Sequence, residues 1–357
     1  MHILHVVGVR PNFMKVAPLM DAINHHNFIK QTLVHTGQHY DRNMSQIFFQ
    51  QLSLPEPDIN LEVGSGSHAV QTAEIMVRFE KVVRLEQPDW VMVYGDVNST
   101  IATSLVCSKL QIPVAHVEAG LRSGDRRMPE EINRLLTDQI ASLLFTSSQD
   151  ADENLKKEGV SSEKIHFVGN TMIDSLVRLL PSAQQLPLPA IPEKFVLVTL
   201  HRPSNVDDPR TLQKIIAALS RISKRIPILF PIHPRTRKQI NDCGIHLPVT
   251  DGLILMEPLG YLEFLALQNK ALLVVTDSGG IQEETTYLRI PCLTMRENTE
   301  RPVTITLGTN ILIGNDTKLL EDEIYNIIGG KIKRGEIPPL WDGTTGKRIV
   351  DIMLQYA

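Results

Sequence analysis

Cysteine, net charge and long apolar runs are all scarce in this sequence, and each scarcity excludes a class of protein. The 357 residues include three cysteines, which lie far apart and match no metal-ligand spacing. The formal net charge is -4, and the sequence has no block of basic residues that would indicate a nucleic-acid-binding surface. No apolar run approaches the roughly 18 residues of a membrane span. We therefore expect a protein that neither binds nucleic acid nor inserts into a membrane.

The start of the sequence has no recognisable targeting signal. It opens directly on the strand-like segment His2–Val7, without the charged stretch, apolar core and cleavage site of a signal peptide. A sparse, odd number of cysteines is typical of a reducing compartment. Both features predict a cytoplasmic protein.

The composition is that of an ordinary globular protein, and the chain is long. Hydrophobic residues make up 42% of the sequence and charged residues 21%, close to the averages for folded domains. A chain of 357 residues exceeds one ordinary α/β core and suits two domains of about 150–200 residues each. We expect two domains, each with its own hydrophobic core.

Short apolar runs alternate with amphipathic segments along nearly the whole chain. Runs without polar alternation, separated by helical patterns, predict parallel sheets covered on both faces. The strands expected in the first half are His2–Val7, Gln31–Thr36, Asp89–Tyr94, Val114–Val117, Leu143–Thr146 and Lys164–Val168. Those expected in the second half are Phe195–Leu200, Ile228–Ile232, Leu253–Met256, Ala271–Thr276, Cys292–Met295 and Asn310–Ile313. The sequence therefore predicts an α/β protein of two doubly wound, Rossmann-like lobes with a cleft between them.

A proline-rich segment separates the two halves. Residues 181–193 contain four prolines, and proline both lacks an N–H donor and disfavours helix at the preceding residue. We interpret this segment as a linker between an N-terminal lobe, residues 1–180, and a C-terminal lobe, residues 194–344. The last segment, 345–357, has a helical pattern and is expected to pack back on the first lobe. Doubly wound sheets bind ligands beyond the carboxyl ends of their strands, so residues just after strands carry the most information.

A glycine turn follows the first predicted strand. Gly8 and Arg10 lie in this turn, and the helical segment after it contains Lys15. Free backbone N–H groups at the start of a helix suit an anion, and the planar guanidinium of an arginine can grip a phosphate in two places. The alternative is a surface turn with a solvated arginine. The dinucleotide pattern G-x-G-x-x-G is absent, so the turn is not an NAD fingerprint.

Three acidic residues of the first lobe stand at the ends of predicted elements. Asp96 and Glu118 follow strands, and Glu130 begins a helix. An aspartate before a helix is often only an N-cap, and Glu130 with Arg134 four residues later is often only a solvated ion pair. Glutamate caps helices poorly, so Glu118 is harder to explain in this way. Three carboxylates at the same end of one lobe form a candidate acid–base group.

The second lobe has its own candidates for binding a phosphate. His201 and Arg202 follow a predicted strand, and the segment Thr276–Ile281 leaves another strand to begin a helix. Glycines in that segment would let a phosphate approach the backbone, unless it is a plain strand–helix turn. Glu284, one helical turn further, could accept both hydroxyls of a ribose. The other candidates are Ser278, Gly279, Gly280, Arg301 and the lone histidines His233 and His39, whose alternative role is structural.

These segments, taken in order, resemble the UDP-N-acetylglucosamine 2-epimerases of the non-hydrolysing type. Any one motif is weak, but the ordered set spans nearly the whole chain. The motifs are G-x-R-P (Gly8–Pro11), T-G-Q-H (Thr36–His39), Y-G-D-V-N-S-T (Tyr94–Thr100), H-V-E-A-G-L-R-S (His116–Ser123), P-E-E-I-N-R (Pro129–Arg134), V-G-N-T-M-I-D (Val168–Asp174), D-S-G-G-I-Q-E-E (Asp277–Glu284) and M-R-E-N-T-E-R-P (Met295–Pro302).

The resemblance implies a fold, a reaction and a set of roles. It implies two lobes of the GT-B type and interconversion of UDP-N-acetylglucosamine and UDP-N-acetylmannosamine, for the supply of cell-surface polysaccharide precursors. The implied route is elimination of UDP across C1–C2, giving a 2-acetamidoglucal, and re-addition with inverted configuration at C2. It implies neither a metal nor a nicotinamide cofactor, and a homodimer is expected.

Matching motif positions assign the residues of the site. Asp96, Glu118 and Glu130 are the expected acid–base residues, with Lys15 and His201 as catalytic supports, and which carboxylate removes the C2 proton stays open. The residues expected to bind the UDP-sugar are Arg10, Lys15, Asp96, Glu118, His201, Arg202, His233, Ser278, Gly279, Gly280, Glu284 and Arg301.

Two segments depart from many bacterial members. Residues Tyr40–Gln46 do not continue T-G-Q-H as those members do, and the segment 124–128 before Pro129 is shorter. Both segments lie near the activating second UDP-sugar site of the bacterial enzymes, so allosteric activation is not expected here. The sequence of these two segments resembles the 2-epimerases of UDP-2,3-diacetamido-glucuronic acid. The substituents at C3 and C6 of the substrate's sugar therefore stay open. The rival interpretations are a hydrolysing 2-epimerase, a GT-B glycosyltransferase and a non-catalytic UDP-sugar sensor.

Overall fold

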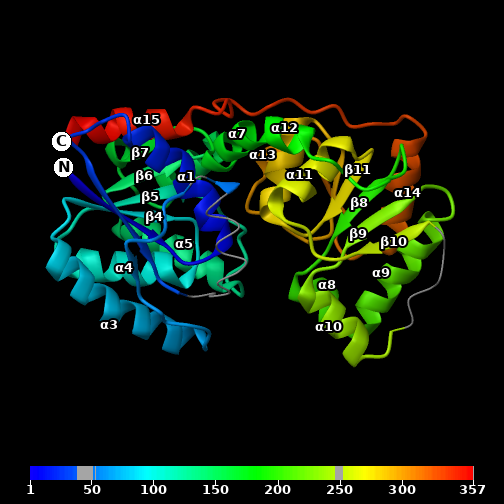
Figure 1. The fold of residues 1–357 in the computed structure, drawn as a ribbon, viewed down its shortest axis with the longest axis horizontal. Coiled ribbons are helices and arrows are strands. Elements are labelled where there is room, and N and C mark those ends of the chain that lie inside the picture. The colour runs from blue at the N-terminus through cyan, green and yellow to red at the C-terminus, as the bar shows by residue number, and fades with distance from the viewer. Residues whose placement is uncertain (38–50, 53, 246–251, 357) are drawn as a thin grey trace. The chain divides into compact units, whose positions relative to one another are not determined.

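The computed structural model describes residues 1–37, 51–52, 54–245 and 252–356. The chain divides into two compact units, one formed by Met1–Arg178 and Pro339–Ala357 and the other by Leu179–Pro338. Each unit contains one fully parallel sheet with helices packed on it, so the prediction of two doubly wound, Rossmann-like α/β lobes is confirmed (Figure 1). Within the described ranges, no helix is both long and apolar enough to cross a membrane.

The first unit is built on a seven-stranded sheet in the order β3-β2-β1-β4-β5-β6-β7. Its strand order reverses beside β1, so the topological switch point lies between β1 and β4, the place where doubly wound sheets bind ligands. The strands are β1 (His2–Val7), β2 (Lys30–His35), β3 (Ile59–Asn60), β4 (Trp90–Tyr94), β5 (Val114–Ala119), β6 (Leu143–Thr146) and β7 (Ile165–Phe167).

Helices cover both faces of this sheet. Those on one face are α3 (His68–Glu86), α4 (Asn98–Lys109) and α5 (Pro129–Ile140), while α1 (Arg10–Ile23) and α15 (Thr345–Met353) lie on the other (Figure 1). Val91 and Val93 of β4 pack with Ile75 and Phe79 of α3 in one buried cluster. Burying one such side chain contributes about 1.5–3 kcal/mol, which is why the apolar runs form the central strands. The unit also contains α6 (Gln149–Lys157), η1 (Ser162–Lys164), the part of α7 (Thr171–Gln185) up to Arg178, and η2 (Leu354–Tyr356).

The end of the chain returns to the first unit through α15. The backbone N–H of Gly346 donates to Asp174 Oδ2 at 2.7 Å, so a carboxylate of α7 binds the first turn of α15. A Cβ on Gly346 would lie 2.7 Å from the carbonyl oxygen of Pro18, so glycine permits the close approach of α15 to α1. Upstream, Trp341 Nε1 donates to the carbonyl of Ser147 at 2.8 Å. These contacts fix the last residues to the first sheet.

The second unit repeats the winding with six strands in the order β10-β9-β8-β11-β12-β13. Its switch point lies between β8 and β11. The strands are β8 (Val196–Thr199), β9 (Ile228–Pro231), β10 (Leu253–Met256), β11 (Leu273–Thr276), β12 (Cys292–Thr294) and β13 (Asn310–Leu312). The helices are α8 (Pro203–Val206), α9 (Pro209–Ile222), α10 (Pro234–Asp242), α11 (Tyr261–Lys270), α12 (Gly279–Leu288), α13 (Val303–Thr306) and α14 (Thr317–Ile328).

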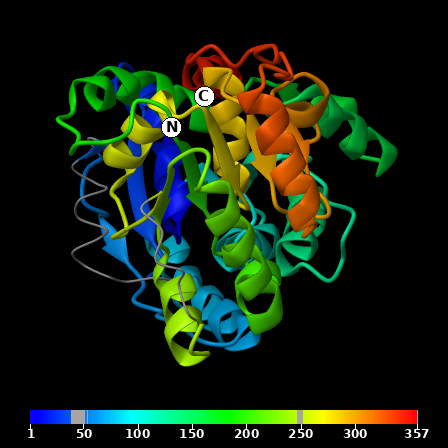
Figure 2. The ribbon, with the colours of Figure 1, turned by 90° about the vertical axis from the view of Figure 1, so that its right-hand side faces the viewer.

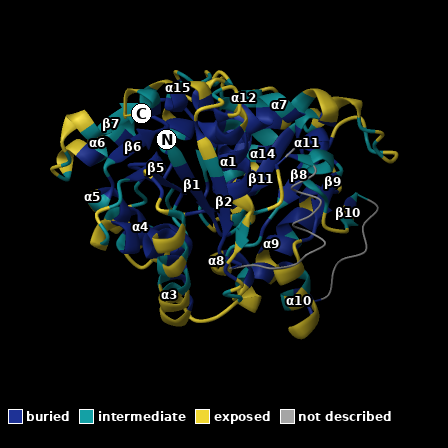
Figure 3. Cartoon of the chain, turned by 60° about the vertical axis from the view of Figure 1, so that its left-hand side comes forward, coloured by how far each residue is buried: buried dark blue, intermediate teal, exposed yellow. Residues whose placement is uncertain are grey.

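Apolar burial follows the same plan in the second unit. Helices α9 and α14 lie side by side and are joined at the surface by Arg221 and Glu321, whose closest atoms are 2.5 Å apart (Figure 2). Leu212, Ile216 and Leu320 are among the buried residues that pack against the strands. In both units the central strands are buried and the exposed residues are concentrated on the outer helix faces and loops (Figure 3).

Pro181, where the sequence analysis begins a linker, lies inside helix α7. A proline within a helix removes a single backbone hydrogen bond, to the residue four positions earlier. Pro181 is exposed, so water can satisfy the acceptor that it leaves, and α7 continues to Gln185. The irregular segment accordingly begins after Gln185 and not at Pro181, and the boundary between the two units falls inside α7, after Arg178.

Candidate active site

A buried ion pair stands at the carboxyl ends of the central strands of the first unit. Lys15 of α1 donates from Nζ to Oε1 of Glu118, at the end of β5, with a distance of 2.7 Å. Each residue exposes only 5% of its surface. Removing both charges from water costs more than an apolar pair would, so the pair is poor evidence for a purely stabilising role. The two predicted residues are therefore brought together as a unit.

Glu118 has a backbone conformation that glutamate rarely adopts. Its φ is 71°, in the left-handed region, and the register between β5 and β6 shifts there, between Val117 and Ala119. In a regular strand, residues two apart share a face. Here His116 contacts α5, whereas Glu118 contacts Lys15 of α1. The bulge therefore re-aims the Glu118 carboxylate toward Lys15, and strain of this kind concentrates at functional positions.

Gly95 makes room for the ion pair. It follows β4 with a φ of 65°, and a Cβ built there would lie 2.6 Å from Lys15 Nζ. Oε1 of Glu118 would be 3.8 Å away. Any side chain at position 95 would thus push directly on the buried ammonium, so glycine is required for space as well as for its φ.

We expect Gly95→Ala to destabilise the first unit by about 2 kcal/mol more than Gly124→Ala does, because overpacking adds to the backbone strain. Gly124 has a φ of 72° but no atom within 4 Å of its built Cβ, so it isolates the conformational cost. Denaturant unfolding of the two variants measures the difference. Equal losses would show that Lys15 moves aside freely.

Asp96 follows Gly95 and does not serve as a helix cap. The N-cap of α4 is Val97, and no side chain caps that helix. Instead, Arg134 Nη1 donates to Asp96 Oδ2, and Asn133 Nδ2 donates to the Asp96 backbone oxygen at 2.9 Å. The Asp96 side chain keeps 23% of its surface exposed. It is therefore oriented by its neighbours and still open to a ligand.

Of the two glutamates that begin α5, the structure buries Glu131 and leaves Glu130 partly exposed. Glu131 accepts hydrogen bonds from the N–H groups of Ser123, at 3.0 Å, and Gly124, at 2.9 Å, and Arg134 Nη2 lies 2.6 Å from Oε2. Burial raises the pKa of Glu131, but these donors outweigh it and hold that pKa below its usual value. Glu131 therefore organises the loop before α5, and the acid–base role of Glu130 stays a prediction.

In the glycine turn after β1, two of the backbone N–H groups that were predicted to bind an anion are bonded to a side chain of the protein. The N–H groups of Gly8 and Val9 both donate to Asn12 Oδ1, at 3.0 and 3.1 Å, so these two donors serve the turn itself. A Cβ on Gly8 would lie 2.2 Å from Ser99 Oγ, so the glycine serves packing against α4. Arg10, the first residue of α1, is exposed and remains the candidate for binding an anion there.

In the second unit a buried aspartate organises the switch point. Asp277, directly after β11, is fully buried. Its Oδ2 accepts hydrogen bonds from the N–H groups of His201 and Arg202 and from Asn205 Nδ2, at 2.8–2.9 Å, and His201 Nδ1 lies 3.0 Å from Oδ1. Burial raises the pKa of Asp277, but His201 and the other donors outweigh burial and hold that pKa below its ordinary value. The carboxylate thus ties the turn after β8 to the end of β11.

His201 and His233 lie close together beyond β8 and β9. Their ring centroids are 5.3 Å apart, and His201 keeps 35% of its side chain exposed. Because Nδ1 of His201 faces Asp277, Nε2 is the ring nitrogen on the far side, placed to meet a ligand. His233 is the N-cap of α10, with its Nδ1 accepting from the Arg235 N–H at 3.2 Å. His233 therefore caps α10, and its part in binding the UDP-sugar stays a prediction.

The D-S-G-G turn leads into α12 as predicted. Ser278 is the N-cap, and Gly279 and Gly280 are the first two helical residues, whose N–H groups have no acceptor within the helix. A Cβ on Gly279 would lie 2.5 Å from Arg301 Nη1. Arg301 itself is buried and paired with Glu283, at 2.8 Å from Nε, and with Glu300. Its guanidinium thus lies directly beneath the start of α12.

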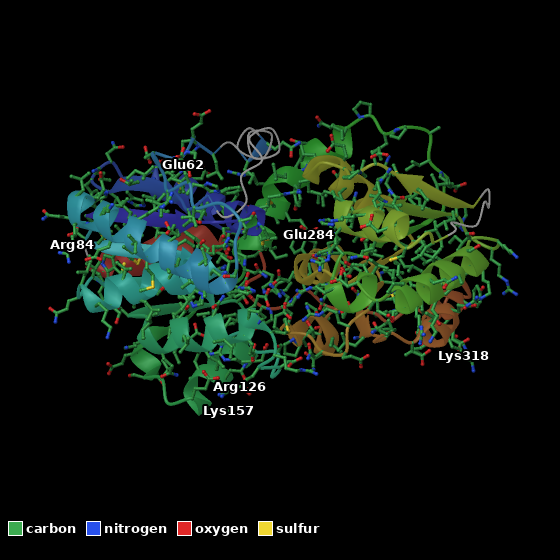
Figure 4. The ribbon with its side chains drawn as sticks, turned by 90° about the horizontal axis from the view of Figure 1, so that it is seen from below. Glu62, Arg84, Arg126, Lys157, Glu284 and Lys318 are labelled. Carbon is green, nitrogen blue, oxygen red and sulfur yellow. The ribbon has the colours of Figure 1, made fainter. Side chains whose placement is uncertain are left out.

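Glu284 lies one turn into α12 and is almost fully buried (Figure 4). Tyr261 of α11 donates its hydroxyl to Oε1 at 3.0 Å. Burial raises the pKa of Glu284 to about 7, against the opposing hydrogen bonds of Tyr261 and Gln268. A carboxyl group so placed gains most from a partner whose hydroxyls donate hydrogen bonds to its ionised form.

His39 and the segment Tyr40–Gln46, whose sequence differs from that of many bacterial members, lie outside the described residues.

Asn133, His116 and Asp277 are contributors that the sequence analysis quoted within motifs without a role, and Arg134 is one that it offered only as an ion-pair partner of Glu130. Their only signal was position, because each stands within four residues of a predicted carboxylate or histidine or at a strand end. What joins them to the site is contact between residues distant in sequence, such as Arg134 with Asp96.

Comparison of the sequence with known proteins shows the family to which the chain is similar. A family model of UDP-N-acetylglucosamine 2-epimerase matches residues 21–354. The chain is 44% identical to the UDP-N-acetylglucosamine 2-epimerase of Methanococcus maripaludis, over 98% of this chain and 97% of that protein. It is 42% identical to the UDP-2,3-diacetamido-2,3-dideoxy-D-glucuronate 2-epimerase of Pseudomonas aeruginosa, over 93% of this chain and 94% of that one.

A solved structure agrees. The crystal structure of the Methanocaldococcus jannaschii UDP-GlcNAc 2-epimerase in complex with UDP-GlcNAc and UDP matches with a TM-score of 0.93 and 43% identity, over 100% of both chains. The family model spans nearly the whole chain, and these relatives match both of its Rossmann-like lobes. The chain belongs to the UDP-N-acetylglucosamine 2-epimerase family, with a fold of the GT-B type.

Proposed function

We propose that the protein interconverts UDP-N-acetylglucosamine and UDP-N-acetylmannosamine by inverting C2. The observation that carries the proposal is the buried Lys15–Glu118 pair at the switch point of the first sheet, beside the oriented carboxylate of Asp96, in a chain of this family. A carboxylate held by an ammonium in a strained β-bulge is suited to proton transfer and costs too much to be kept for stability alone.

The proposed reaction needs a base, an acid and a stabilised leaving group. A carboxylate removes the proton from C2 while the C1–O bond breaks and its electron pair leaves with UDP, which gives a 2-acetamidoglucal. UDP then adds back at C1 while a proton is delivered to the opposite face of C2. Two faces must be served, so more than one of Asp96, Glu118 and Glu130 takes part. Lys15 holds the Glu118 carboxylate in place.

The residues of the second unit suit the UDP portion. The first N–H groups of α12 offer positive potential to a diphosphate, while Arg301 beside Gly279 is paired with Glu283 and Glu300. When both ring nitrogens carry a proton, His201 donates from Nδ1 to Asp277, which holds the ring, and from Nε2 to a phosphate oxygen as negative charge develops on departing UDP. Glu284 would accept the ribose hydroxyls. From the family resemblance we also propose a cytoplasmic homodimer that supplies polysaccharide precursors.

Incubation with UDP-N-acetylglucosamine in deuterium oxide tests the function. We expect a mixture of the two UDP-sugars, with deuterium at C2 of both. Free UDP together with free N-acetylmannosamine would instead establish the hydrolysing reaction. No exchange at C2 without an acceptor would favour a glycosyltransferase or a sensor. Separation of the products by chromatography, followed by proton NMR, distinguishes these outcomes.

A second substrate is supported by one observation, the 42% identity to the Pseudomonas aeruginosa 2-epimerase whose substrate carries a 3-acetamido group and a C6 carboxylate. Parallel measurements of kcat/KM for UDP-N-acetylglucosamine and for this uronate decide between them. The substrate with the larger kcat/KM is the one whose C3 and C6 groups the site accommodates.

The raised pKa of Glu284 predicts that UDP binding weakens in acid. With a pKa of about 7, Glu284 is mostly ionised at pH 8 and mostly protonated at pH 6, and only the ionised form accepts both ribose hydroxyls. We expect the Kd of UDP to rise by about five- to tenfold between pH 8 and pH 6, beyond the change in Glu284→Gln. The variant is the control because UDP itself titrates in this range. Identical pH profiles of wild type and variant in calorimetric titrations would contradict the assignment.

A further inference from the structure

His116 of β5 is a fully buried histidine with a partner on each ring nitrogen. Nδ1 lies 2.6 Å from Asp138 Oδ1, on α5, and Nε2 lies 2.7 Å from the carbonyl oxygen of Gly95. A carbonyl oxygen only accepts, so Nε2 carries its proton and donates it to Gly95. None of the roles proposed above uses this side chain.

The carboxylate behind the ring is itself firmly held. Asp138 Oδ2 accepts from the N–H of Gly120 at 3.1 Å and from Arg122 Nη2 at 2.7 Å. Burial raises the pKa of Asp138, but His116 and Arg122 outweigh it, so the net pKa lies below the ordinary value. An acceptor fixed in this way sets the rotation of the His116 ring.

Gly95, the residue before Asp96, is bonded to β5 through both its backbone N–H and its backbone carbonyl. The N–H of Gly95 donates to the carbonyl of Val117 at 3.0 Å, and its carbonyl accepts from His116. On the far side of the turn, Asn133 binds the backbone oxygen of Asp96. The strand that carries Glu118 thereby also sets where Asp96 stands (Figure 1 shows β4, β5 and α5 together in the first unit).

We propose that His116 is a positioning residue for the epimerisation, which orients Asp96 by holding the Gly95 carbonyl and is itself oriented by Asp138. This proposal rests on the proposed function. A misplacement of about 1 Å at a reacting group costs up to about 10²-fold in rate, so a hydrogen bond that fixes one turn is enough to matter.

Hydrogen-bond complementarity gives a set of variants that separates position from bulk. In His116→Ala the Gly95 carbonyl loses its donor. In Asp138→Asn the amide nitrogen can donate to Nδ1 of a neutral ring while Nε2 still donates to Gly95, and the amide oxygen still accepts from Arg122. In the double variant His116→Gln/Asp138→Asn, the glutamine amide donates to Gly95 and accepts from the introduced asparagine amide, so the chain of hydrogen bonds is again complete. Single His116→Gln sets its amide oxygen against the Asp138 carboxylate.

The kinetic experiment measures kcat and KM with UDP-N-acetylglucosamine and the Kd of UDP, each per folded protein. We expect His116→Ala to lower kcat by about 10²-fold while KM and the Kd of UDP change less than about threefold. Asp138→Asn and the double variant should keep kcat within about fivefold of wild type, and His116→Gln should fall well below the double variant. Rescue by the second substitution is a result that loss of packing alone would not give.

His5→Gln is the matched control. His5 is also fully buried in the same sheet, with Nδ1 2.6 Å from the Tyr94 hydroxyl and Nε2 3.1 Å from Gln31 Oε1, but it does not hold the Gly95 carbonyl. We expect it to lower the melting temperature and leave kcat nearly unchanged. Equal losses of kcat in His5→Gln and His116→Ala, or a double variant as slow as His116→Ala, would overturn the proposal. A wild-type protein that binds UDP without turnover would refute the proposed function instead, and the variants are compared only once wild-type turnover is measured.

Discussion

Glu118→Gln is expected to lower kcat by about 10³-fold or more, because it removes the carboxylate proposed above for general acid–base catalysis. The amide still fits the bulge and can still accept a hydrogen bond from Lys15, so the change removes proton transfer while leaving the shape. The rate of deuterium entry at C2 measures the effect on the chemical step itself. We expect binding of UDP to be nearly unaffected, since most of the UDP contacts proposed above come from the second unit and Arg10, the candidate of the first unit, is unchanged.

Glu62→Gln is the control for this variant. Glu62 also has a left-handed backbone, with a φ of 52°, but its side chain is exposed at the end of β3 (Figure 4). We expect wild-type kcat for it, which separates the chemistry at position 118 from the cost of a glutamine in that backbone region. If Glu118→Gln kept a rate near wild type, Glu118 would be a structural partner of Lys15 and the acid–base role would fall to Asp96 and Glu130.

The second large effect concerns stability. We expect Asp277→Ala to destabilise the second unit by about 4 kcal/mol, because it leaves buried donors without their acceptor. The N–H groups of His201 and Arg202 and the amide of Asn205 all lose the same carboxylate. Differential scanning calorimetry follows the loss, and the affinity for UDP should fall with it because His201 is no longer oriented.

Asp208→Ala provides the comparison. Asp208 is an exposed N-cap whose Oδ2 accepts from the Thr211 N–H at 2.9 Å at the start of α9. Losing such a cap costs about 1 kcal/mol. If both variants lost the same stability, the buried hydrogen bonds to Asp277 would contribute no more to the stability than one exposed helix cap does.

The sequence was sufficient for the alternation of elements and for the places where strands end. Parallel strands buried on both faces leave unbroken apolar runs, so the predicted runs His2–Val7, Leu143–Thr146 and Leu253–Met256 coincide with β1, β6 and β10. Helix α3 was not predicted. Its buried stripe recurs every four residues from Gln71 to Val83, but Val70 and Leu85 are apolar and exposed, which blurs the periodicity.

The candidate site was predictable in its residue types and not in its pairings. Strand ends located Asp96, Glu118 and His201, because the carboxyl ends of parallel strands share one edge. The Lys15–Glu118 bond depends on a bulge that flips one residue of β5, and no periodicity in the sequence encodes it. The sequence also offered Glu130 and Arg134 as a pair, whereas the contacts of Arg134 with Asp96 and Glu131 depend on how α5 meets the turn after β4.

The return of α15 to the first unit has a consequence for the order of synthesis. The second unit is continuous in the chain, from Leu179 to Pro338, whereas the first is completed only by Pro339–Ala357. A ribosome therefore releases every residue of the second sheet before it releases the helix that covers α1. On the nascent chain, the unit that carries Lys15, Asp96 and Glu118 is the last to acquire its full set of packing partners, although its residues are made first.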